Sequence, residues 1–109
     1  MERKSLTLTK DTFPERVLAS ARPVLVDFWA GWCAPCHRLA PVVERLAAAF
    51  EGRVVVGKVN VDDDPELARA HGIRSIPSLL LFRGGAVVER SVGVRSFEDL
   101  SAWLERALA

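Results

Sequence analysis

The segment Cys33-Ala34-Pro35-Cys36 holds both cysteines of this 109-residue chain and constrains its fold more than any other feature. An apolar, strand-like run precedes the segment and a helical pattern follows it. Two thiols three positions apart at a helix start can form a disulfide across one turn. Unpaired N–H groups and the positive end of the helix dipole favour a thiolate there, and a thiolate is the species that attacks disulfides. Pro35 suits the first turn, since it has no N–H to leave unpaired. The pattern favours redox chemistry over a structural disulfide or two idle thiols.

Length, composition and charge exclude several classes of protein. At 109 residues and 50% hydrophobic content, the chain suits a single domain, residues 1–109, with one core. Fifteen Lys and Arg against fourteen Asp and Glu give a net charge of +1 with no basic block, so no nucleic-acid partner is expected. No apolar run reaches the length of a membrane span, and no apolar signal segment opens the sequence. We therefore expect a cytoplasmic monomer with no membrane partner. In a reducing cytosol a lone cysteine pair is more often catalytic or metal-binding than structural.

Hydrophobic periodicity predicts an α/β fold. Strands are expected at 6–8, 24–29, 54–61, 78–82 and 86–92, and helices at 12–18, 34–50, 65–71 and 97–108. The resulting order, β-α-β-α-β-α-β-β-α, implies a single mixed β-sheet flanked by helices on both faces.

Several single residues predict where these elements begin, bend and end. Asp64 and Ser96 are expected as N-caps, and Gly72 as the residue just after a helix end. Gly84-Gly85 predicts a hairpin turn. Pro41 lies inside the long helix and should kink it.

Five features resemble the thioredoxin family, and the match covers nearly the whole chain. They are the block from Val26 to Cys36, the helix proline Pro41, Lys58-Val59-Asn60-Val61-Asp62, Gly72-Ile73-Arg74-Ser75-Ile76-Pro77-Ser78, and Val92-Gly93. Three positions depart from the family's pattern. Ala34 replaces a usual glycine and bears on the redox potential, whereas His37 and Ser78 replace a common lysine and a common threonine.

The resemblance implies a thioredoxin fold and a general protein-disulfide reductase that serves cell redox homeostasis. Cys33 would be the exposed nucleophile and Cys36 the buried resolving thiol. The redox-active disulfide Cys33–Cys36 would need no other cofactor. Disulfide-containing target proteins and thioredoxin reductase would be the partners.

Asp27 interrupts a run that otherwise suits a central strand. A lone carboxylate buried there is costly, so its proton should be held more tightly than in water. The functional interpretation is a general acid/base that serves Cys36. The alternatives are a satisfied buried polar group or a strand-end residue that faces solvent. By resemblance, Lys58 lies on the adjacent strand and pairs with Asp27; the alternative is an ordinary solvated lysine.

The resemblance also implies a substrate-docking face and two structural residues. Ile76 and Pro77 should be joined by a cis bond that presents the Ile76 backbone to an extended substrate strand, with Gly93 giving that strand room. Trp29 should pack under the active-site loop, and Pro41 is structural. The expected docking residues are Trp32, Ala34, Pro35, Val61, Ile76, Pro77, Val92 and Gly93.

Four other functions compete with this interpretation. The residues from Cys33 to His37 also spell a c-type haem attachment motif, although the only methionine is Met1. A zinc site of Cys33, Cys36, His37 and His71 lacks the usual spacing of a second ligand pair. A binding module without catalysis, and a disulfide-forming oxidase or isomerase, are the other two. A measured redox potential separates an oxidase from a reductase.

Overall fold

The computed structural model describes residues 4–109, which form one five-stranded mixed sheet with the strand order β1-β3-β2-β4-β5. Strands β1, β3 and β2 are parallel, whereas β4 runs antiparallel to β2, and β5 to β4. The strands are β1 Leu6–Thr7, β2 Val24–Trp29, β3 Val55–Asn60, β4 Ser78–Arg83 and β5 Ala86–Val92. The helices are η1 Pro14–Leu18, α1 Ala34–Ala49, α2 Pro65–Ala70 and α3 Phe97–Leu108. The predicted order of elements and the mixed sheet are confirmed.

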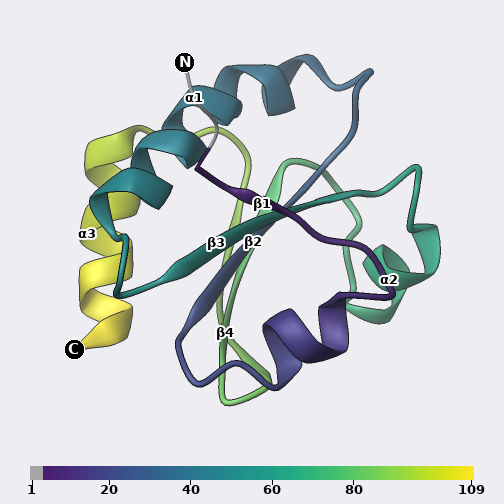
Figure 1. Ribbon diagram of the computed structural model, residues 1–109. Coiled ribbons are helices and arrows are strands. Elements are labelled where there is room, and N and C mark those ends of the chain that lie inside the picture. The colour runs from purple at the N-terminus through teal and green to yellow at the C-terminus, as the bar shows by residue number, and fades with distance from the viewer. Residues whose placement is uncertain (1–3) are drawn as a thin grey trace.

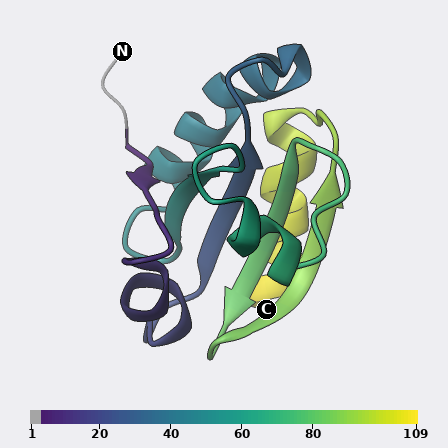
Figure 2. The same cartoon turned by 90° about the vertical axis from the view of Figure 1, so that its right-hand side faces the viewer.

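Helices cover both faces of this sheet. Helices α1 and α3 lie on one side, and η1 and α2 lie on the other (Figures 1 and 2). Side chains of β2 alternate between the two cores: Leu25 packs with α1 and α3, whereas Val24, Val26 and Phe28 pack with η1 and α2. Because side chains alternate along a strand, Asp27 shares the face of Leu25 and lies under α1.

Helix η1 differs from the prediction in its type and its start. It is a single π-helical turn in which Ala19 N–H donates to the Pro14 carbonyl oxygen at 2.9 Å. Its N-cap residue is Phe13, and the Oγ1 of the preceding Thr12 accepts a hydrogen bond from Thr9 N–H at 3.0 Å. Pro14 has no N–H for a regular helical bond, and buried Phe13 and Val17 fix the turn against the core.

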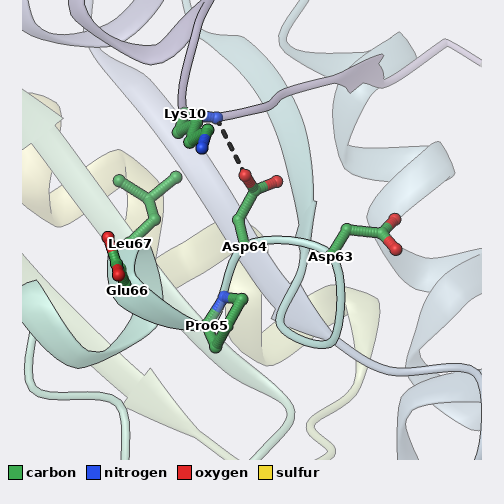
Figure 3. A pocket seen from close by; sticks show the side chains of 6 residues that line it. All are labelled: Lys10, Asp63, Asp64, Pro65, Glu66 and Leu67. Carbon is green, nitrogen blue, oxygen red and sulfur yellow. Dashed lines mark hydrogen bonds between the residues drawn. The ribbon is translucent and has the colours of Figure 1, made fainter.

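The two predicted N-caps have different outcomes. Ser96 caps α3, since its Oγ accepts a hydrogen bond from Asp99 N–H at 3.0 Å. Asp64 is the N-cap residue of α2, as predicted, but its side chain makes no cap hydrogen bond. The Asp64 carboxylate instead accepts a hydrogen bond from Lys10 N–H at 3.2 Å (Figure 3). Buried Asp64 therefore joins the segment that follows β1 to the start of α2.

The hairpin between β4 and β5 turns at Gly84 and Gly85, as predicted. Their φ angles are +60° and +83°, in the left-handed region that a two-residue hairpin turn requires. A Cβ on Gly85 would lie only 2.9 Å from the Leu18 carbonyl oxygen. Glycine is therefore needed there both for the turn and for its contact with η1.

Helix α1 is the longest helix described, and it runs through Pro41 without ending. Helix α2 ends at Ala70, and Gly72 just beyond it has a φ of +69°. Among residues 4–109, no helix combines the length and apolar character that crossing a membrane requires.

Candidate active site

The two cysteines lie at the start of α1 and are joined as a disulfide. Cys33 is the N-cap residue, and Cys36 lies in the first turn, with 5.3 Å between their Cα atoms. The backbone N–H of Cys36 donates to the Cys33 sulfur at 3.2 Å. A free N–H of the helix start therefore points at Cys33, where it would stabilise a thiolate in the reduced form.

Both cysteines are buried in this oxidised form. Cys33 is 4% exposed and Cys36 is 2% exposed. They form a small apolar cluster with Ala30, against which Trp29, Val61 and Ile76 pack. The Ile76 carbonyl oxygen lies 3.8 Å from the Cys33 sulfur. The expectation of an exposed Cys33 is therefore wrong here, because the segment before β4 and the end of β3 cover its sulfur.

The Ile76–Pro77 bond is cis, as expected. Pro77 is buried, and its carbonyl oxygen accepts a hydrogen bond from Gly93 N–H at 2.9 Å. The two loops expected to face a substrate are thus tied together through their backbones. Gly93 has a φ of +91°, a conformation that favours glycine.

An apolar surface surrounds the disulfide. Trp32 is 71% exposed and Val92 is 60% exposed, while Ala34 is also exposed. Pro35, Val61, Ile76 and Gly93 are half-buried, so of the predicted docking residues only Pro77 lies beneath the surface. A cavity of about 180 Å³ opens beside the disulfide; its lining includes Trp32, Val61, Ile73, Arg74 and Ile76.

Sequence reasoning missed the partner that holds Trp32. The indole Nε1–H donates to the Asp62 carboxylate at 2.9 Å, and Asp62 N–H in turn donates to the Asn60 side chain at 2.9 Å. Asp62 lies within one of the segments that resemble the thioredoxin family, but nothing in that segment indicated a bond to Trp32. The exposed indole is thus anchored at its polar edge and leaves its ring free to contact a substrate.

Asp27 is the acidic residue of the site whose pKa is shifted furthest from its ordinary value. It is 1% exposed, and neither carboxyl oxygen has a hydrogen-bond partner among residues 4–109. Burial raises the pKa of Asp27 to about 7, the charge of Lys58 opposes that rise, and the charge of Glu44 adds to it. The interpretations as a satisfied polar group and as a solvent-facing strand end are therefore wrong, and the carboxyl can exchange a proton near neutral pH.

Lys58 lies beside Asp27 without forming an ion pair to it in the described part of the chain. The two residues are directly opposite in the register of β2 and β3. The Lys58 ammonium lies 4.8 Å from the centroid of the Trp29 ring, a cation–π distance. Lys58 is half-buried. The charge of Lys58 therefore acts on Asp27 through space, while its ammonium lies over the indole ring of Trp29.

Comparison with known proteins agrees with this geometry. The family model described as Thioredoxin matches residues 4–106. The chain is 50% identical over 101 residues to "Thioredoxin 1" of Nostoc sp., covering 93% of this chain and 94% of the relative. It is also 45% identical over 104 residues to "Thioredoxin" of Alicyclobacillus acidocaldarius, covering 95% and 98%. A third relative, "Thioredoxin" of Synechocystis sp., is 48% identical over 97 residues, which cover 89% and 91%.

The chain belongs to the thioredoxin family.

Membership confirms the thioredoxin fold and the predicted class of activity. Together with the disulfide at the start of α1, it makes the chain a protein-disulfide reductase, a disulfide oxidoreductase whose redox-active group is its own cysteine pair. Proteins of this family act on disulfide-containing targets. The haem interpretation required two cysteine sulfurs free to bond a porphyrin, whereas here they are bonded to each other. In the described residues, no three His, Cys, Asp or Glu side chains come together as a metal site.

Of the three residues that depart from the family's pattern, His37 and Ser78 form hydrogen bonds to backbone carbonyl groups, and Ala34 is exposed. His37 Nε2–H donates to the Gly31 carbonyl oxygen at 2.7 Å, and its ring meets Trp29 edge-on. Ser78 Oγ donates to the Ser75 carbonyl oxygen at 2.6 Å, next to the cis bond. Ala34 is exposed between the two cysteines. His37 and Ser78 therefore each join the loop at one end of an element to that element.

Proposed function

We propose that Cys33 is the nucleophile by which this protein reduces target disulfides. In the reduced form, the Cys33 thiolate attacks one sulfur of a target disulfide, and the other target sulfur leaves as a thiolate that takes up a proton. The observation that carries this assignment is the Cys36 N–H that donates to the Cys33 sulfur at the start of α1. The start of the helix offers this otherwise unpaired N–H group to the Cys33 sulfur.

Cys36 then resolves the mixed disulfide. Its thiolate attacks the Cys33 sulfur, the Cys33–Cys36 bond forms, and the second target sulfur leaves as a thiol. The target gains two electrons, and the cysteine pair loses two. Asp27 is proposed as the base that accepts the Cys36 proton and returns it to the leaving sulfur. A carboxyl with a pKa of about 7 suits this exchange at neutral pH.

Lys58 is proposed to tune Asp27, since its charge lowers the pKa that burial raises. The exposed apolar residues around the disulfide are proposed to dock the target, whose extended backbone would pair with Ile76. Trp29 and Pro41 are proposed as structural residues. We further propose that thioredoxin reductase returns the electrons and that the protein works in the cytoplasm, because a dithiol reductase needs a reducing compartment.

Cysteine variants test the assignment of roles. The parent should reduce insulin disulfides with dithiothreitol or thioredoxin reductase as the electron source. Cys33→Ser should abolish turnover, whereas Cys36→Ser should accumulate a mixed disulfide that mass spectrometry of the trapped peptide places on Cys33. Trapping on Cys36 in the Cys33→Ser variant instead would reverse the two roles. A redox potential typical of protein oxidants would contradict the proposed reductase direction.

A further inference from the structure

Glu44 places a second carboxylate on the face of the sheet that carries Asp27. It projects from α1 toward the edge strand and accepts three hydrogen bonds there. Its Oε1 accepts from Lys4 N–H at 2.7 Å and from Ser5 N–H at 2.9 Å, and its Oε2 accepts from Ser5 Oγ–H at 2.6 Å. The carboxylate is half-buried. These contacts fix its position, since three donors from one short segment hold both oxygens.

Lys58 lies on the strand between Asp27 and the edge of the sheet that Glu44 contacts. The strand order β1-β3-β2 places Lys58 of β3 next to Asp27 of β2, and places Ser5, just before β1, at the outer edge. Val56 and Leu25 belong to the core under α1 and α3, so Lys58 and Asp27 share that face by the alternation of strand side chains. Helix α1 covers this face, so Glu44, held by Ser5 at the outer edge, lies on the same face as Lys58 and Asp27.

We propose that Glu44 is a positioning residue for the redox reaction: a fixed negative charge that offsets the Lys58 ammonium at Asp27, so that the Asp27 carboxyl can both accept and return a proton near neutral pH. This inference rests on the proposed acid/base role of Asp27. Without Glu44, the full charge of Lys58 would act on Asp27 alone and favour its ionised form.

The electrostatics of the cluster agree with this arrangement. Partial burial alone would raise the pKa of Glu44, but the bonds from Ser5 and Lys4 and the charge of Lys58 outweigh it, so the pKa lies below its ordinary value. Glu44 is therefore ionised at neutral pH. Its charge raises the pKa of Asp27, whereas Lys58 lowers it.

Within residues 4–109, Lys58 and Glu44 are the charged groups that act on Asp27; the residues named next are apolar, and Cys36 does not titrate in the oxidised form. On β4, its neighbour in the register is Leu79, and α3 adds Leu100, Trp103 and Leu104 to the core on this face. Cys36 of α1 is held in the disulfide. The oxidised protein thus isolates the effect of Glu44 and Lys58 on Asp27.

The test is the titration of the Asp27 carboxyl carbon by NMR in oxidised Glu44→Gln protein. The glutamine side-chain oxygen can still accept from the N–H groups of Lys4 and Ser5, and its NH₂ group can donate to Ser5 Oγ. The variant therefore removes the charge and keeps hydrogen bonds to the same groups. The apparent pKa of Asp27 should fall by roughly half a pH unit relative to the parent. The pH midpoint of mixed-disulfide resolution by Cys36 should fall with it.

Ser5→Ala is the matched control for a merely structural role. It removes one bond to Glu44 but leaves the charge, so it should lower the urea midpoint without moving the Asp27 titration. Glu44→Ala removes both charge and bonds and should shift the titration in the same direction as Glu44→Gln. An unchanged Asp27 titration in Glu44→Gln, or an equal shift in Ser5→Ala, would overturn the inference. Because the carboxyl carbon is observed directly, this failure is distinct from finding that Asp27 plays no part in catalysis.

Discussion

Replacing Asp27 by asparagine should stabilise the oxidised protein, and increasingly so as the pH rises. The carboxyl has a pKa of 3.8 as a model value and about 7 in the fold. A group whose folded pKa is raised stabilises the fold fully below the unfolded pKa and loses that contribution as pH rises through the interval, here from about 4 to about 7. At about 1.36 kcal/mol for each pKa unit, the complete loss amounts to about 4 kcal/mol.

The expected difference between variant and parent follows from that interval. At pH 5, the parent should already have lost about 1.5 kcal/mol to the ionisation of Asp27, and at pH 8.5 about 4 kcal/mol. Asparagine does not ionise. Its neutral side chain is buried without a hydrogen-bond partner, as the protonated carboxyl is, so the free-energy cost of burying a neutral polar group is similar in the two proteins and largely cancels. The stability gain of Asp27→Asn should therefore grow by about 2.5 kcal/mol between these two pH values.

Urea unfolding of both oxidised proteins from pH 5 to pH 8.5 measures this difference. The titrations of all other groups are shared by the two proteins and cancel in the comparison. A stability difference that stays flat across this range would refute the reasoning, because it would mean that Asp27 ionises as freely in the fold as in the unfolded chain. The same variant should also resolve the mixed disulfide more slowly, since Cys36 loses its base.

Two further predictions concern packing and docking. Gly57→Ala should lower the unfolding free energy by about 1–3 kcal/mol, because the new Cβ would overlap the side chain of buried Leu8. Gly31→Ala is the control, since a Cβ there would have no atom within 4 Å, and it should unfold at nearly the parent's urea midpoint. Trp32→Ala should lower kcat/KM for insulin about tenfold but affect the reaction with a small aromatic disulfide much less, since only a protein target covers the exposed indole; equal losses for both substrates would contradict a docking role.

Local sequence was a good guide where an element's own residues dictate it. The apolar run of β2 and the glycine pair before β5 led to correct strands and a correct turn, because burial and positive φ are demanded by those residues themselves. Ser96 capped its helix as expected because the bond stays within one turn. Asp64 is at the N-cap position of α2 but makes no cap bond, because its carboxylate accepts a hydrogen bond from the backbone N–H of Lys10, 54 residues away. Local rules alone cannot reveal that competitor.

The features of the active site likewise divide into those that the sequence predicted and those that depend on residues distant in the chain. The spacing of the cysteines and the polar Asp27 within an apolar strand indicated redox chemistry and a perturbed acid before any coordinates. The expected exposure of Cys33 failed because Ile76 and Val61, distant in the chain, cover its sulfur. The Asp62 bond to Trp32 and the contact of Lys58 with Trp29 were likewise beyond prediction.

The sequence by itself determined which chemistry is possible: two thiols at a helix start, one carboxyl in a buried strand, and an order of elements that folds into one mixed sheet. Tertiary structure alone decided how that chemistry is tuned. It brought Glu44 of α1 and Lys58 of β3 onto the face that carries Asp27, and it covered the Cys33 sulfur with the Ile76 carbonyl. The reason is that a pKa or the access to a sulfur depends on distance and dielectric surroundings, and these arise only when segments far apart in the chain pack together.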